Sequence, residues 1–134
     1  MRLRRENKEV ETDAIANAGF KTPIDKDGNP VPIILVSDDI WKKLGSPKQH
    51  DFIVSLSGLL MQSTPFFCYD VEVSVVADDR DVRWVRCYMA VQPKRKESLM
   101  NTYLIHLLKI QLIDVYEGLW RFSDDPPNKI RRSV

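Results

Sequence analysis

Few residues in this sequence have types and spacing that could do chemistry. Asp78, Asp79 and Asp81 stand close together between two predicted strands. Their carboxylates are ligands that a divalent cation accepts. Aspartate is also a common turn former, and a turn is the interpretation that we favour for these three residues. We therefore predict no metal site at this position.

A second acidic segment, residues 25–29, reads Asp-Lys-Asp-Gly-Asn and resembles the first half of a calcium-binding EF-hand loop. The resemblance ends at the sixth position, where Pro30 replaces the glycine that the loop requires. The twelfth position is Val36, which has no carboxylate to offer. Because Asp-Gly-Asn also suits a plain tight turn, we predict no calcium site here.

Catalytic motifs are equally scarce. The sequence contains no nucleophile elbow, no phosphate-binding glycine loop and no Cys/His metal spacing. Its two histidines, His50 and His106, fall on different predicted helices, so only a pairing of His106 with an aspartate of residues 78–81 stays open. We predict a protein that is not an enzyme, with no catalytic residues and no cofactor.

Length and composition indicate one ordinary globular domain. The 134 residues are 43% hydrophobic and 29% charged, with a formal net charge of +1, which does not favour strong nonspecific binding to polyanions. We expect the two cysteines, Cys68 and Cys87, to form no disulfide, and a reducing, cytoplasmic location fits them best. We expect neither a secretory signal nor a transmembrane segment.

The clearest β pattern is a hairpin at about residues 69–91. Apolar residues alternate with polar ones in both halves, and residues 78–81 form the connection. A symmetric closure there places Val75 opposite Trp84 and Val71 opposite Tyr88. A further strand, at about residues 31–36, is predicted at a sheet edge because Pro30 and Pro32 cannot donate to a ladder.

Three helices are predicted around these strands. Ser37 is a capping residue for a helix at 38–44, and a capping box at Ser46 begins a helix at 47–62. The longest helix is predicted at about 95–122, but its apolar face rotates beyond Lys109. Either this helix breaks near residues 111–114, or its second half packs against something other than its own core.

These elements predict an α+β fold, in which a small antiparallel sheet (the hairpin at 69–91 and the edge strand at 31–36) packs on two or three helices, the longest at 95–122. Residues 1–13 are too charged to fold alone, so we expect a tail that is disordered or ordered by a partner. Residues 14–123 form the single domain. Residues 124–134 are predicted to be a C-terminal tail.

The predicted function is that of a non-catalytic structural or adaptor subunit, which acts by protein-protein contacts in a viral or other macromolecular complex. Its partner is another protein or further copies of the chain, and the contact surface is the second half of the long helix: Leu112, Tyr116, Leu119 and Trp120. The alternative is a nucleic-acid-binding module, with Trp84 or Tyr88 stacking on bases. Its phosphate contacts would be Arg83, Arg86, Lys94, Arg95 and Lys96.

Overall fold

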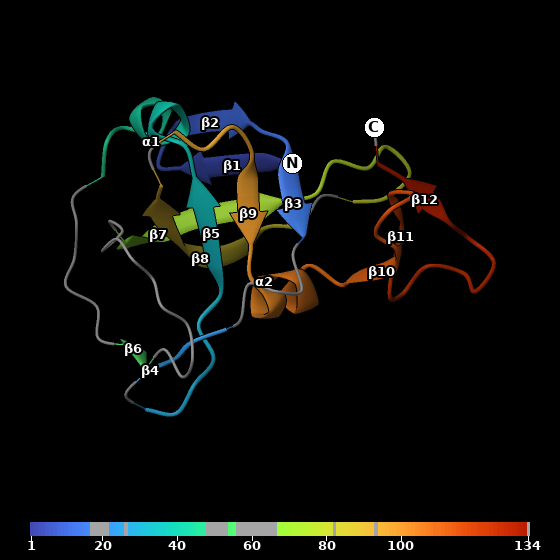
Figure 1. The fold of residues 1–134 in the computed structure, drawn as a ribbon. Helices are drawn as coiled ribbons and strands as arrows, with labels where there is room; N and C mark the ends of the chain where they lie inside the picture. The colour runs from blue at the N-terminus through green and yellow to red at the C-terminus, as the bar shows by residue number, and fades with distance from the viewer. Residues whose placement is uncertain are drawn as a thin grey trace.

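The computed structural model describes residues 1–16, 22–25, 27–47, 54–55, 67–81, 83–92 and 94–133; at 54–55 and 67–68 it describes the backbone alone. This part of the chain is mainly β, with sheets of seven, three and two strands and two helices of six residues each (Figure 1). The predicted α+β fold, a small antiparallel sheet packed on two or three helices, is therefore wrong.

The largest sheet is curled. Its strand order is β2-β1-β7-β8-β5-β9-β3, so β2 and β3 are its two edge strands. Only Thr12 and Asp13 separate these two strands in the chain, which brings the two edges of the sheet close together. The strands are β1 (Arg2–Arg5), β2 (Lys8–Glu11), β3 (Ala14–Ala16), β5 (Ile33–Val36), β7 (Phe67–Ser74), β8 (Val85–Val91) and β9 (Ser98–Met100).

Residues 1–13, predicted to be a tail, lie within this sheet. β1 and β2 form a tight hairpin, and Glu6 adopts a positive φ of 56° at its turn. β1 also pairs with β7, which places Leu3 opposite Val73 and buries it completely. The apolar residues in this segment are few, and the later strand β7 completes the burial of Leu3.

β5 is an internal strand, not the predicted edge strand. It pairs in parallel with β8 and antiparallel with β9, and all four of its residues are buried. Pro30 and Pro32 lie before the strand begins, so neither removes a donor from its ladders. Burial on both faces explains the uninterrupted apolar run Ile-Ile-Leu-Val, which is typical of a strand with a parallel neighbour.

β7 and β8 pair antiparallel where the sequence predicts a hairpin, but in another register. Val73 lies opposite Val85, and Val71 lies opposite Cys87, one residue away from the predicted partners. A shift of one residue in the pairing moves every side chain of a strand to the other face. Cys87 and Met89 therefore face the core, and Trp84 and Tyr88 do not join the predicted face.

The predicted helix at 95–122 does not form. Its residues make β9, the helix α2 (Thr102–Leu107), and the strands β10 (Ile110–Asp114) and β11 (Leu119–Phe122). Asn101 caps the start of α2, and Lys109, with a φ of 60°, follows its end. The rotated apolar face that the sequence shows beyond Lys109 marks this change from helix to strand.

The remaining elements close the fold. The helix expected at 38–44 is α1 (Asp38–Lys43), capped by the Ser37 side chain. Most of the helix predicted at 47–62 lies outside the described residues, and 54–55 form the strand β6 (Val54–Ser55), paired with β4 (Ile24–Asp25). In the predicted C-terminal tail, β12 (Arg131–Arg132) pairs with β11.

The main core joins side chains of the curled sheet to Leu44, which follows α1, and to Leu104 of α2. A smaller cluster around Ile33, Leu35 and Ala90 lies on the opposite face of β5 and β8. The three-stranded sheet of β10, β11 and β12 stands beside the β3 edge of the curled sheet (Figure 1). This placement creates the groove described next.

Candidate functional site: a groove between the two sheets

One wall of the candidate site is the edge strand β3. It is short and consists of Ala14, Ile15 and Ala16, paired in parallel with β9. Ala14 and Ala16 pack against the main core, whereas the side chain of Ile15 is 42% exposed. β3 is an edge strand that pairs with β9 alone among the described strands.

The other wall is the hairpin of β10 and β11. Leu112 pairs with Trp120 across it, and a β-bulge follows before Asp114. In its turn, the Glu117 N–H donates to the Asp114 carboxylate (3.1 Å), and Gly118 adopts a φ of 71° that suits glycine. The Tyr116 side chain at the tip of this turn is 95% exposed.

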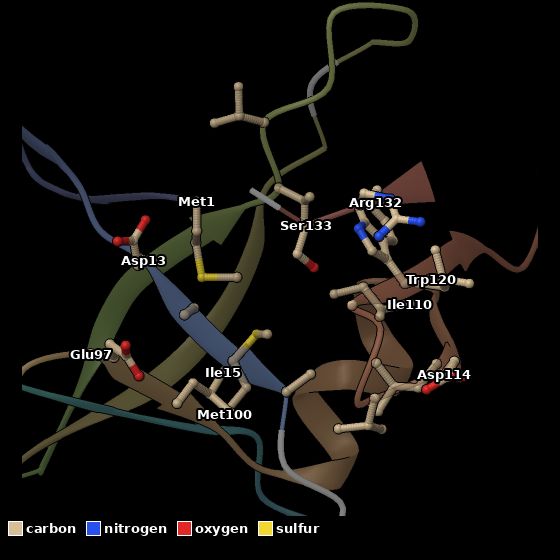
Figure 2. A pocket seen from close by; sticks show the side chains of 18 residues that line it. Met1, Asp13, Ile15, Glu97, Met100, Ile110, Asp114, Trp120, Arg132 and Ser133 are labelled. Atoms are coloured by element: carbon tan, nitrogen blue, oxygen red, sulfur yellow. The ribbon is translucent and has the colours of Figure 1, made fainter. Parts of the chain in front are cut away.

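Between these walls lies a groove of about 510 Å³. Figure 2 shows Ile15 and Met100 on the side of the curled sheet and Ile110 and Trp120 on the side of the hairpin. The lining is mainly apolar, and a volume of this size is typical of ligand pockets. Further apolar side chains in the lining are Met1, Val75, Val76, Leu112, Val115 and Leu119.

Two carboxylates line the groove on the β3 side. Asp13 and Glu97 are exposed, and neither forms an ion pair with any residue in the described part of the chain. Arg132 lies across the groove (Figure 2), and its Nη1 atom is 3.9 Å from Oε2 of Glu117. The β3 side of the groove therefore carries two carboxylates, and the Met1 ammonium, which also lines the groove, interacts electrostatically with Asp13.

An ion network holds the hairpin wall in place. Arg131 in β12 makes paired hydrogen bonds to Asp79 (2.9 and 3.0 Å) and to Asp125 (2.9 and 3.1 Å). Arg80 binds Asp124 with both terminal nitrogens, at 2.9 and 3.0 Å. Because Asp79 and Arg80 belong to the β7–β8 connection, this network ties the second sheet to the first.

The same network changes the ionisation of its carboxylates. Hydrogen bonds from Arg131 and Lys129 lower the pKa of Asp79, and those from Arg131 lower the pKa of Asp125 to about 2. The Phe122 ring lies under the guanidinium carbons of Arg80 (3.9 Å) and Arg131 (4.9 Å). Of the three loop aspartates that could have bound a cation, Asp79 is therefore engaged by Arg131 and Lys129.

The other acidic segment is also engaged internally. The Asp25 carboxylate accepts the backbone N–H groups of Asp27 and Asn29, both at 2.9 Å. This is the hydrogen bonding of a tight turn. Across the described residues, no group of three or more His, Cys, Asp or Glu side chains is placed to hold a metal ion.

The predicted interface residues meet at the groove, with one exception. Leu112, Leu119 and Trp120 line it, and Tyr116 stands at the hairpin tip outside the lining. The sequence missed the opposite wall: Asp13 was placed in the predicted tail, and no strand was predicted at residues 14–16. The signal available in the sequence was the symmetric placement of Leu3 and Val10 about Glu6 and Asn7. These two residues pair across the hairpin.

The predicted nucleic-acid contacts do not form one patch. Arg83 precedes β8 and Lys94, Arg95 and Lys96 follow it, so about 20 Å of strand separates them. Arg86 is exposed within the strand.

The aromatic side chains predicted to stack on bases are in contact with protein groups. Arg4 lies 3.9 Å from the centre of the Trp84 ring, and the rings of Tyr69 and Tyr88 are 4.1 Å apart. A base would have to displace these contacts to stack on Trp84 or Tyr88.

Of the two histidines, His50 lies outside the described residues. His106 is exposed in the last turn of α2, and its ring stacks on that of Tyr103 at 6.0 Å. The structure shows no hydrogen bond between His106 and an aspartate of the described part of residues 78–81.

Comparison with known proteins found no matching family model, no similar curated protein and no similar solved structure. None of the helices in the described ranges has the length and apolar content needed to cross a membrane.

Proposed function

We propose that this protein is a non-catalytic binding module that works by protein-protein contacts through the groove between the two sheets. The observation that carries the proposal is the groove itself, whose hairpin wall contains three of the four residues that the sequence predicts as an interface. Val115, in the groove lining, is 73% exposed, and Tyr116, next to it in the chain, is 95% exposed. These two side chains extend the apolar surface to the hairpin tip. Exposed apolar surface that is continuous with a groove is typical of interaction sites.

Selection from a displayed library of random eight-residue peptides tests this proposal. The full chain is immobilised, and enrichment is compared between the wild type and Val115→Asp. Val115 lines the groove but is mostly exposed, so the added charge should block apolar ligands without unfolding the protein. We expect peptides that bind the wild type and lose at least tenfold in affinity on the variant.

Ile130→Asp is the matched control. Ile130 is 58% exposed and does not line the groove, so the same new charge should leave peptide binding unchanged. If the two substitutions affect binding equally, or if no peptide is enriched on the wild type, the groove is not the binding surface.

The competing prediction, nucleic-acid binding, has a simple test. The mass of the purified protein in solution is measured before and after nuclease treatment. Co-purified nucleic acid that disappears on digestion, and whose binding falls when Arg83 and Arg86 are replaced by Gln, would favour this alternative over the groove.

A further inference from the structure

No strand in the described part of the chain pairs with the edge of β3 that faces away from β9. The Asp13 carbonyl accepts the Ser98 N–H at 2.9 Å, which fixes the direction of alternate backbone groups in the strand. Because backbone groups point to alternate sides, the N–H and C=O groups of Ala14 and Ala16 are directed away from β9. Within the described residues these groups have no backbone partner. They offer a ladder on which another strand can pair.

This edge is recessed. The groove lies along it, and the β10–β11 hairpin forms the opposite wall (Figures 1 and 2). The same edge of a second copy stands beside its own hairpin, so two such edges cannot approach each other. A single extended segment of another protein can enter, with its backbone against β3 and alternate side chains against Leu112 and Trp120.

Charge selects among such segments. Asp13 and Glu97 precede β3 and β9 on this side of the groove and have no ion pair within the described ranges (Figure 2). The Met1 ammonium interacts with Asp13 electrostatically and offsets part of this charge. A basic side chain on the incoming segment would neutralise them, whereas an acidic one would be repelled. Complementary charge of this kind mainly sets which partner is accepted.

We propose that the groove binds an extended segment of a partner protein that adds a strand to the free edge of β3, alternates apolar side chains, and places a Lys or Arg beside Asp13 and Glu97. Main-chain hydrogen bonds give such complexes their affinity, and the pockets for alternate side chains give specificity. The inference rests on the proposed function and deepens it, because it states how the segment is held.

The first test removes one edge donor. In Ala14→Pro the missing N–H is one that points into the groove, so the ladder with β9 keeps its hydrogen bonds. Peptides enriched on the wild type should bind this variant about tenfold more weakly, provided that its melting temperature is unchanged.

The second test leaves the protein intact. Each enriched peptide is synthesised with N-methyl groups on one or the other set of alternate amides. Methylation of the set that faces β3 should abolish binding, and methylation of the other set should not. Equal tolerance of both sets would overturn strand addition.

The third test exchanges charge. Asp13→Lys should lower the affinity for peptides that carry Lys or Arg at the selected position. It should raise the affinity for the same peptides with Glu at that position. Asp27→Lys, at an exposed aspartate outside the groove, is the matched control and should change neither.

The outcomes separate the two proposals. Binding that is lost on Val115→Asp but survives Ala14→Pro and N-methylation keeps the groove as the binding site and overturns strand addition. Peptides without a basic preference overturn the role of Asp13 and Glu97. Enrichment that no groove variant affects overturns both proposals.

Discussion

At the scale of single residues, Asn101 shows how one buried polar side chain fixes the fold. It is completely buried and joins β5 to α2. Its side-chain oxygen accepts the N–H groups of Ile33 (3.0 Å) and Leu104 (3.1 Å), and its amide donates to the Val31 carbonyl (2.7 Å). The same residue therefore caps a helix and satisfies the strand that the helix packs against.

Asn101→Ala should lower the free energy of unfolding by about 3 kcal/mol or more, because it leaves three buried backbone groups without partners at roughly 1–3 kcal/mol each. Urea denaturation measures the change. Asn128→Ala, at an exposed position, should stay within about 0.5 kcal/mol of the wild type. A similar small effect at Asn101 would mean that water replaces its side chain.

The sequence predicted single residues unevenly. Leu112, Leu119 and Trp120 are recognisable from their size and from an apolar face that no single helix could bury. Asn101 is not recognisable, because an asparagine inside a predicted helix has no visible partner. Asp13 was hidden for a related reason: its importance depends on β3 and β9 lying side by side, and more than 80 residues separate them in the chain.

At the scale of elements, the second sheet depends on the ion network around Arg131. Asp79 and Asp125 have lowered pKa values because Arg131 donates hydrogen bonds to both. A carboxylate with a lowered pKa in the folded state stabilises that state at every pH above its unfolded pKa, which is about 3.9. This stabilisation is lost as the pH falls from about 4 towards the folded value of about 2 for Asp125.

We therefore expect the β10–β12 sheet to loosen between about pH 4 and pH 2, before the curled sheet unfolds. The Trp120 indole signal in NMR spectra should report the change. In Arg131→Gln the sheet should already be weakened at neutral pH, and the Trp120 signal should change less between pH 4 and pH 2. A wild-type Trp120 signal that stays constant down to pH 2 would contradict the role of this network.

The β10–β11 hairpin also separates two residues that the sequence grouped together. The Trp120 ring contacts that of Phe122 edge to face at 5.0 Å, whereas Tyr116 is 95% exposed. Trp120→Ala should cost about 2 kcal/mol of stability, and Tyr116→Ala less than about 0.5 kcal/mol. Thermal melting of both variants measures this difference, and equal losses would show that the turn around Tyr116 is packed.

Elements were predictable where the local pattern decides between helix and strand. The cap at Ser37 and the alternation in β7 and β8 are local signals, and both elements form. The register of β7 and β8 differs from the predicted one already at Val73 and Val85, and it shifts again at a bulge between Cys68 and Val71; alternation reveals neither change. The segment 95–122 failed because its apolar spacing fits a helix as well as short strands, and the αL residue Lys109 carries no distinctive sequence signal.

At the scale of the whole molecule, strands near both ends of the sequence, β1, β2 and β12, are paired in the sheets. Leu3 is completely buried between β2 and β7. Leu3→Ala should therefore lower the free energy of unfolding by about 2–5 kcal/mol. Chemical denaturation tests this, and Val10→Ala, at a partly buried position opposite Leu3, should cost less. No loss at Leu3 would restore the interpretation of residues 1–13 as a tail.

Other whole-molecule expectations stay predictions. The cytoplasmic location inferred from two cysteines, the lack of catalysis and the place in a larger assembly each need an experiment on the protein in its cell. The single-domain organisation predicted for residues 14–123 would have to extend in both directions, because β1, β2 and β12 belong to the sheets.

The two-residue link between β2 and β3 also has a consequence for how the chain is made. β1 cannot pair with β7, nor β3 with β9, until the ribosome has synthesised these later strands, and the last residue of β9 is Met100. At roughly 5–20 residues per second, a ribosome needs on the order of ten seconds to add the residues between β3 and β9. During that time the first strands have only each other to pair with. The charged residues of β1 and β2, which made residues 1–13 look like a tail, disfavour pairing of these two strands with the wrong chain.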